Sequence, residues 1–308
     1  MSAALVLALL PIAVLIALGA WLRHRHFLNE GFWPQAERLG YYLLLPSLFL
    51  HSLATAQLDD VPVREMVAVL LLSTVPVAML FVALRGLLKV DDAAFTSLFQ
   101  GGIRFNNYVG VSAAAGLFGT HGIALAAVAN ATIVPTVNIL CVLVFARYGS
   151  AGRLSLKATL RQLALNPLVL ACLIGILLQL LGVGLPAGIG PALKALGQAS
   201  LPLGLLCVGA ALNFAAAGSW LKPVGVSSLA KFVVMPAATL LACHLLGLRG
   251  EAAVTAILFQ TLPTASSSYI MARQLGGDAP LMAGIIASQT VIAGLALPLV
   301  VISLATWL

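Results

Sequence analysis

Two short polar stretches interrupt the otherwise apolar runs of this chain, and they hold the side chains best suited to bind a ligand. The first, residues 101–107, contains two glycines, Arg104 and two asparagines. The second, residues 260–268, contains Pro263, Thr264 and three serines. Because glycine and proline weaken or break a helix, each stretch is expected to end one half-helix and begin another.

The beginning of a half-helix suits an anion, because its free N–H groups carry a partial positive charge. We expect Asn106 or Asn107 to cap one half-helix, and Thr264 or Ser266 the other. Arg104 would add a full positive charge. The candidate substrate-binding residues in or beside the two stretches are Gln100, Arg104, Asn106, Asn107, Gln260, Pro263, Thr264, Ser266 and Ser267.

A packing role is the alternative for several of these residues. Glycines and small hydroxyl side chains also let helices approach closely in membranes. Arg104 has two other options, which are a bond to a backbone carbonyl and an extension toward the membrane surface.

The composition places both stretches inside a membrane protein. Hydrophobic residues make up 61% of the chain and charged residues 8%, with a mean hydropathy of +1.09. A soluble domain carries about 25% charged residues, so the surplus apolar surface must face lipid. The net charge of +7 does not indicate nucleic-acid binding, because the basic residues lie between apolar runs rather than in a patch.

Apolar runs of about 20 residues, the length that crosses a bilayer, predict an all-α protein of about ten transmembrane helices. Residues 2–21 are interpreted as a retained first helix, since positive charges follow this run rather than precede it. The predicted spans are 3–22, 36–56, 65–88, 93–118, 122–146, 160–182, 191–216, 224–246, 251–274 and 279–306.

Basic residues predict the orientation of the spans. One set of alternate loops holds eleven Lys and Arg residues and the other holds three, namely Arg64, Lys194 and Arg249. The richer side is expected to be cytoplasmic, which leaves both termini outside. Lys231, within the eighth span, is expected to extend its stem toward the cytoplasm, with a mechanistic role as the alternative.

The nine acidic residues all lie in loops or at the ends of the predicted spans, and none lies in the interior of a span. We therefore expect no tight sodium site and no carboxylate proton relay; transport would be uniport, anion exchange, or proton-linked through the substrate or a histidine. The histidines and the four cysteines show no metal-ligand spacing, so no metal or cofactor is expected, and the cysteines are interpreted as core residues.

The two halves of the chain resemble each other, which predicts a first repeat over 1–150 and a second over 151–308. Leu-Phe-Gln leads into both polar stretches, at residues 98–100 and 258–260. Leu45-Pro46 matches Leu201-Pro202, and single prolines, Pro76 and Pro236, lie in spans 3 and 8. Because five spans are an odd number, the second copy must be inverted, an arrangement common in secondary transporters.

Several motifs resemble those of the auxin efflux carrier family. They are Arg104-Phe105-Asn106-Asn107-Tyr108-Val109-Gly110, Gln260-Thr261-Leu262-Pro263-Thr264, Asn166-Pro167 and Leu201-Pro202-Leu203. The resemblance covers essentially the whole chain. It implies two inverted five-helix repeats in a sodium/proton-antiporter-like fold, with crossed broken helices in spans 4 and 9. It also implies a scaffold of spans 1, 2, 6 and 7 and a moving part of spans 3–5 and 8–10, working by an elevator-type mechanism.

The resemblance also implies small organic anions as substrates, including dicarboxylates in bacterial members and auxin in plant members. The short segment between Arg147 and Arg161 favours a bacterial member, located in the cell inner membrane. Span 4 has glycines where plant members have proline, so this break departs from their pattern. Asn130 is a further candidate ligand by its position in span 5, with a helix-packing hydrogen bond as the alternative.

Two other functions stay open at this stage. A channel or passive exporter would also need broken helices, whereas an intramembrane enzyme would need a catalytic motif that Asp59-Asp60, Asp91-Asp92 and Ser266–Ser268 do not supply. The expected partners are a small organic anion and the lipid bilayer, with a homodimer left open and no nucleic acid.

Overall fold

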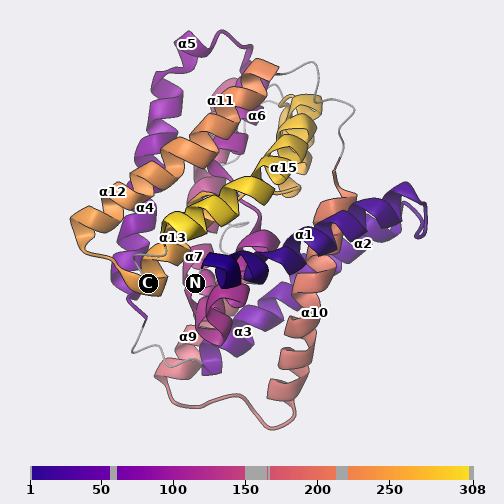
Figure 1. Ribbon diagram of the computed structural model, residues 1–308, viewed down its shortest axis with the longest axis vertical. Coiled ribbons are helices and arrows are strands. Elements are labelled where there is room, and N and C mark those ends of the chain that lie inside the picture. Colours follow the sequence, from indigo (N-terminus) through magenta and orange to yellow (C-terminus); the bar gives the residue numbers. More distant parts are fainter. Residues whose placement is uncertain (1, 56–60, 150–164, 166, 213–220, 305–308) are drawn as a thin grey trace.

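The computed structural model describes residues 2–55, 61–149, 165, 167–212 and 221–304, and every regular element in these ranges is a helix (Figure 1). The predicted all-α class is therefore confirmed for the described chain. The helices are α1 (Ser2–His24), α2 (Phe32–Leu39), η1 (Gly40–Leu44), α3 (Leu45–Thr55), α4 (Val63–Ala83), α5 (Arg85–Leu88), α6 (Asp92–Ile103), α7 (Asn107–Tyr148), α9 (Pro167–Leu180), α10 (Ile189–Ala210), α11 (Leu221–Leu229), η4 (Ala230–Val234), α12 (Met235–Leu246), α13 (Gly250–Gln260), α14 (Ser267–Leu275) and α15 (Ala279–Ser303).

Five helical segments among the described residues are long and apolar enough to cross a membrane. They are Val63–Ala83, Asp92–Tyr148, Ile189–Ala210, Leu221–Leu246 and Ala279–Ser303. Large apolar side chains are exposed along several of these segments and along α9, as at Met79, Leu177, Leu241 and Leu295. Such a surface is unfavourable in water and suits lipid, so the chain is a multi-pass membrane protein.

The segment Asp92–Tyr148, at 57 residues, is too long for a single crossing at about 1.5 Å per residue. Within α7, Gly119 has φ 59° and ψ −136°, a backbone conformation that lies outside the helical region. Only glycine adopts such angles easily. Gly119 lies in the gap between the predicted spans 93–118 and 122–146.

Two long helices contain a π-helical turn. The turn η1 joins α2 to α3, and η4 joins α11 to α12. Each π turn widens the helix by one residue and thereby re-aims the side chains that follow, and such turns are frequent at functional sites. Lys231 is the second residue of η4.

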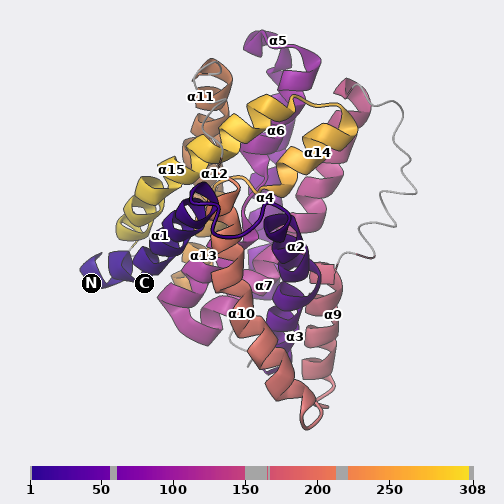
Figure 2. The same ribbon diagram turned by 90° about the vertical axis from the view of Figure 1, so that its right-hand side faces the viewer.

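Two sets of helices pack closely, and α7 and α15 contact both sets. In one, α1 packs on α10, and α3 packs on both α9 and α10. Gly19 and Gly209 allow the backbones of α1 and α10 to approach closely, since a Cβ on either would meet backbone atoms of the other helix. In the second group α4 packs on α7 and α12, and α6 packs on α11 and α15. Figures 1 and 2 place α3, α9 and α10 toward one end of the molecule and α5, α6 and α11 toward the other.

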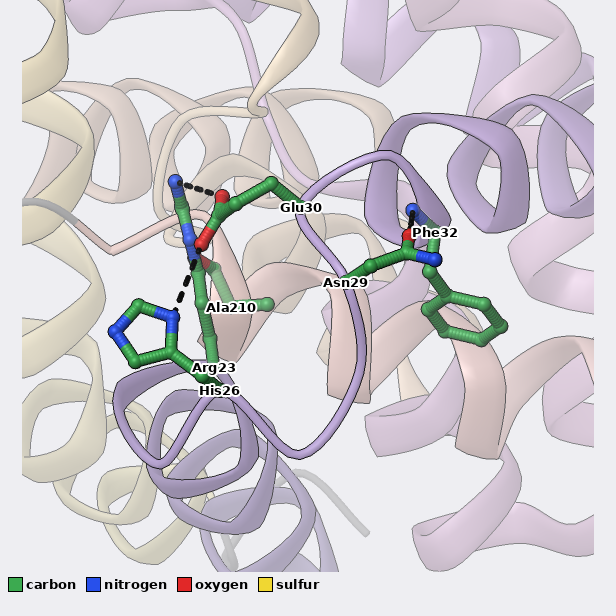
Figure 3. Close-up of polar contacts among 6 residues, drawn as sticks. All are labelled: Arg23, His26, Asn29, Glu30, Phe32 and Ala210. Carbon is green, nitrogen blue, oxygen red and sulfur yellow. Dashed lines mark hydrogen bonds and ion pairs between the residues drawn. The ribbon is translucent and has the colours of Figure 1, made fainter.

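Polar contacts hold the turn between α1 and α2 against the end of α10 (Figure 3). Arg23 donates to the carbonyl of Ala210 and to the carboxylate of Glu30, the latter at 3.1 Å. Asn29 accepts a hydrogen bond from the Phe32 N–H at 2.9 Å as α2 begins. This corner therefore joins α1, α2 and α10.

Some predictions fall on residues outside those described. They are the pair Asp59-Asp60, the basic residues between 153 and 161, the boundary between 150 and 151, Asn166, and the outer ends of spans 160–182, 191–216 and 279–306.

Candidate functional site

The first broken helix consists of α6 and the start of α7. After Ile103 the chain is extended at Arg104 and at Asn106, and α7 begins at Asn107. The side-chain oxygen of Asn106 accepts hydrogen bonds from the N–H groups of Tyr108 at 3.0 Å and Val109 at 3.3 Å. The predicted asparagine cap is therefore confirmed at Asn106, leaving the Asn107 side chain partly accessible at the helix start.

The two glycines of this stretch lie inside α6 rather than in the break. A Cβ on Gly101 would meet Ser227 and Ile285, and one on Gly102 would meet Phe81. The packing alternative is correct for both glycines, because neighbouring side chains fill the space beside them. The helix ends instead at Arg104, where the backbone turns extended.

The second broken helix consists of α13 and α14, separated by residues 261–266. Pro263 lies in this break, as predicted, but the predicted cap is wrong. Ser266 stands at the N-cap position of α14 and makes no side-chain cap bond. The Thr264 hydroxyl points elsewhere, within 3.2–3.4 Å of the carbonyl oxygens of Gln100, Gly101 and Arg104.

Thr264 therefore joins the two breaks instead of starting a helix. Its hydroxyl can donate to one of these carbonyls at a time, at the C-terminal end of α6, where carbonyls lack helical partners. The rings of Phe105 and Phe259 also meet across the breaks, with centroids 5.7 Å apart. The breaks thus lie against each other, and α6 packs on α14 while α7 packs on α13.

Gln289 on α15 completes this junction, and the sequence analysis missed it. Its side-chain oxygen accepts the Thr264 N–H at 3.0 Å. Its side-chain nitrogen donates to the carbonyl of Gly101 at 3.0 Å and to the hydroxyl of Ser227 at 3.1 Å. One amide thus satisfies groups from both breaks and from α11, which fixes the breaks relative to each other. A glutamine within an apolar span was the available signal.

Arg104 is buried, with 9% of its surface exposed, and its guanidinium group has only neutral partners among the described residues. It donates to the side-chain oxygen of Asn138 at 2.8 Å and to the hydroxyl of Ser267 at 3.1 Å. Its Nη1 also lies 3.6 Å from the sulfur of Met271, and its buried Nε has no hydrogen-bond partner. A buried guanidinium is normally paired with a carboxylate, so this site carries an uncompensated positive charge.

The other candidates divide by burial. Gln100, Gln260, Asn130, Pro263 and Thr264 are buried, whereas Asn107, Ser266 and Ser267 are partly accessible. These three accessible residues lie at the beginnings of α7 and α14, beside Arg104. The accessible polar part of the junction is therefore formed by two half-helix starts, and the buried guanidinium of Arg104 lies beside them.

Three buried amides have different surroundings. Gln260 donates to Thr74 at 2.7 Å and to Ser73 at 3.2 Å, so it ties α13 to α4. Asn130 donates to the carbonyl of Ala126 in its own helix at 2.8 Å, and its side-chain oxygen has no partner. Neither amide atom of Gln100 has a hydrogen-bond partner.

Lys231 does not extend to the membrane surface, so that prediction is wrong. Its side chain is 0% exposed and its Nζ has no hydrogen-bond partner in the described chain. The four cysteines are buried and free, which confirms their interpretation as core residues. No group of three or more potential metal ligands occurs among the described residues.

The helices with exposed apolar side chains and the two discontinuous helices that meet around buried polar groups define the class as a multi-pass membrane protein built around a polar junction. The chain belongs to the auxin efflux carrier family, since the family model described as "Membrane transport protein" matches residues 4–301. It is also similar to an uncharacterized transporter of Methanothermobacter thermautotrophicus. The two sequences are 25% identical over 296 residues, covering 94% of this chain and 95% of that protein.

Proposed function

We propose that this protein is a secondary transporter of small organic anions, and that the anion's carboxylate binds at the junction of the two broken helices. The observation that carries the proposal is Arg104, a buried guanidinium without a carboxylate partner among the described residues. Leaving a buried charge unpaired costs several kcal/mol, which an anionic ligand would offset. The bidentate geometry of guanidinium suits a carboxylate.

The half-helix starts beside Arg104 support the same ligand. Asn107 begins α7 and Ser267 begins α14, and both are partly accessible. Each helix start contributes roughly 0.3–2 kcal/mol to a nearby anion. Asn107 and Ser266 offer side-chain donors that would orient the carboxylate.

The proposed architecture is ten spans in two inverted repeats, with the repeats formed by residues 1–150 and 151–308. Two observations support it: Pro76 lies in α4 and Pro236 in α12, and residues 1–150 and 151–308 each contain one broken helix. The close packing of α1 and α3 on α10 supports a scaffold of spans 1, 2, 6 and 7. The packing of α4 on both α7 and α12 supports a moving part of spans 3–5 and 8–10 that carries the junction by an elevator-type mechanism.

In this proposal the protein lies in the cell inner membrane with both termini outside, and it acts without a metal or cofactor. The substrates are carboxylates of dicarboxylate or auxin-like size. A homodimer is compatible with the proposal, which does not depend on one.

The test is counterflow in proteoliposomes. Vesicles loaded with one carboxylate are diluted into the same radiolabelled carboxylate, using a panel of acetate, benzoate, malonate, succinate and indole-3-acetate. The proposal expects saturable uptake of at least one member that internal unlabelled anion accelerates, and loss of this uptake in Arg104→Gln. Non-saturable flux without acceleration would indicate a channel, and no flux of any member would refute the proposed substrate class.

A further inference from the structure

Lys231 is a buried amine that the proposed function leaves without a role. It lies in the π-helical turn η4, is 0% exposed, and its Nζ has no hydrogen-bond partner among the described residues. Lysines in membrane helices normally extend their amine to the headgroup region. Because this one stays buried in protein, its amine must be either neutral or stabilised by a charge that the described chain does not supply.

The packing of α11 on α6 brings Lys231 near the first break. Ala94 on α6 and Val224 on α11 belong to the same apolar cluster. Farther along both helices, Gly101 on α6 lies against Ser227 on α11. The two helices therefore run in the same direction. Figure 1 shows the two helices side by side. Lys231 follows Ser227 by four residues, about one helical turn, and η4 itself packs on α6. Its backbone therefore lies close to the depth of Arg104, the residue at which α6 ends.

Gln100 is a second buried polar side chain on these packed elements without a hydrogen-bond partner. It lies on α6 next to Gly101, it is 0% exposed, and both its amide oxygen and its amide nitrogen are without hydrogen bonds. Most buried polar side chains in proteins have a partner. Two packed elements, α6 and η4, thus each carry a buried polar group that is unsatisfied in this conformation.

No acidic group lies near Lys231 on the elements that pack against η4, which are α6, α11 and α12. On α6 the acidic residue is Asp92, which is largely exposed and pairs with Arg85 at 2.9 Å. On α11 the titratable residue is Lys222, nine positions earlier and about 14 Å away along a helix axis. On α12 the titratable residues are Cys243 and His244, at least twelve positions later and about 18 Å away.

We propose that Lys231 carries the proton that accompanies the transported anion, an inference that rests on the proposed function. With the site empty, Lys231 is a neutral amine. When an anion binds beside Arg104, the amine accepts one proton from the aqueous phase that the site faces and becomes an ammonium. The anion and proton leave together on the other side, so each transported negative charge is balanced by one proton. The sequence analysis expected a different group to carry the proton, either the substrate's own carboxyl or a histidine.

The physical basis is a reciprocal coupling across the end of α6. An anion in the low-dielectric junction stabilises a positive charge nearby. By linkage, a protonated Lys231 must then raise anion affinity by the same factor. Wherever one proton is taken up per anion bound, affinity should fall about tenfold for each unit rise in pH.

The experiment is calorimetric titration of the purified full-length protein with malonate and with indole-3-acetate at pH 8. The titrations are run in Tris and in bis-Tris propane, which are cationic and do not compete with the anion. Because the two buffers differ in ionisation enthalpy, the difference between the measured heats gives the number of protons taken up per anion bound. The wild type should take up between half a proton and one proton per anion. Lys231→Met and Lys231→Gln should bind with no proton uptake, whereas the matched control Lys222→Met, an exposed lysine on the adjoining helix α11, should behave as the wild type.

Each outcome decides a separate point. Binding by the wild type without proton uptake overturns this inference and leaves the proposed function standing. Uptake that persists in both Lys231 variants assigns the proton elsewhere and also overturns it. If neither anion binds and the counterflow panel shows no flux, both the proposed function and this inference fail.

A second measurement is the unfolding midpoint of Lys231→Met. It should equal or exceed that of the wild type, because the variant removes an unpaired polar group. A large decrease would show that the amine has a stabilising partner and would contradict the proposal.

Discussion

Replacing Gln289 with leucine should loosen the junction without touching the accessible residues. The glutamine amide makes three hydrogen bonds, to the Thr264 N–H, the Gly101 carbonyl and the Ser227 hydroxyl, at 3.0, 3.0 and 3.1 Å. Leucine keeps a similar volume but makes none of them. At about 1 kcal/mol for each lost bond, with the buried Thr264 N–H left unsatisfied, the variant should lose about 3 kcal/mol of stability.

The assay is thermal unfolding in detergent, followed by intrinsic fluorescence. A loss of this size should lower the midpoint by roughly 5 °C or more. Gln198→Leu is the matched control, because Gln198 is exposed on α10 and its replacement should change stability by less than about 0.5 kcal/mol. If Gln289→Leu unfolds within about 1 °C of Gln198→Leu, the amide does not hold the breaks together and this description of the junction is wrong.

Three further predictions concern the cap, the topology and the coupling ion. Asn106→Ala should lower the free energy of unfolding by about 1–2 kcal/mol in the same assay, because the N–H groups of Tyr108 and Val109 lose their acceptor. Asn106→Asp should keep both bonds, and an equal loss of stability in the two variants would argue against the cap. A cysteine introduced at Gly152 should not react with an impermeant maleimide outside intact cells, and ready labelling there would reverse the proposed orientation. Counterflow should proceed equally in sodium and in choline media, because no carboxylate lies in the interior of a predicted span, and a strict sodium requirement would contradict this.

The locations of the breaks could be predicted from local sequence. Pro263 lacks a backbone donor and its ring clashes with the preceding turn, so it favours a break at this position. Pro76 and Pro135 lie inside continuous helices, so the polar residues around Pro263 are also needed to predict the break. Asn106 carries a short side chain that can accept from the next N–H groups, which makes a helix start at this position favourable. These effects need no tertiary partner, and the structure places both breaks accordingly.

The role of Thr264 could not be predicted, because its partners lie about 160 residues away on another helix. A hydroxyl near a helix start suits a cap equally well as a bond to a distant carbonyl, and only the packing of α6 decides between them. The sequence also wrongly predicts that Gly101 and Gly102 lie in the break, because their packing depends on distant residues. Their flexibility was visible in the sequence, whereas the side chains of Phe81 and Ser227 that fill the space beside them were not.

Lys231 shows the same limit for a charged residue. Its position within an apolar span was visible, but the direction of its side chain depends on which neighbours surround the π turn η4. Hydropathy favours a lysine that reaches the headgroups, since that costs least in a single helix. In the assembled protein α6 and α12 pack against η4, and the amine remains buried.

The measurement that tests the central claim most directly is anion affinity at the junction, determined by equilibrium binding of the carboxylate that counterflow identifies. Arg104→Gln, Asn107→Leu and Pro263→Ala should each weaken binding tenfold or more while the protein remains folded, since they remove the cation, a donor and the break. Arg273→Gln, which removes an exposed arginine from α14, should bind as the wild type. If Asn107→Leu and Pro263→Ala both bind the anion with wild-type affinity, the anion does not sit between the two breaks.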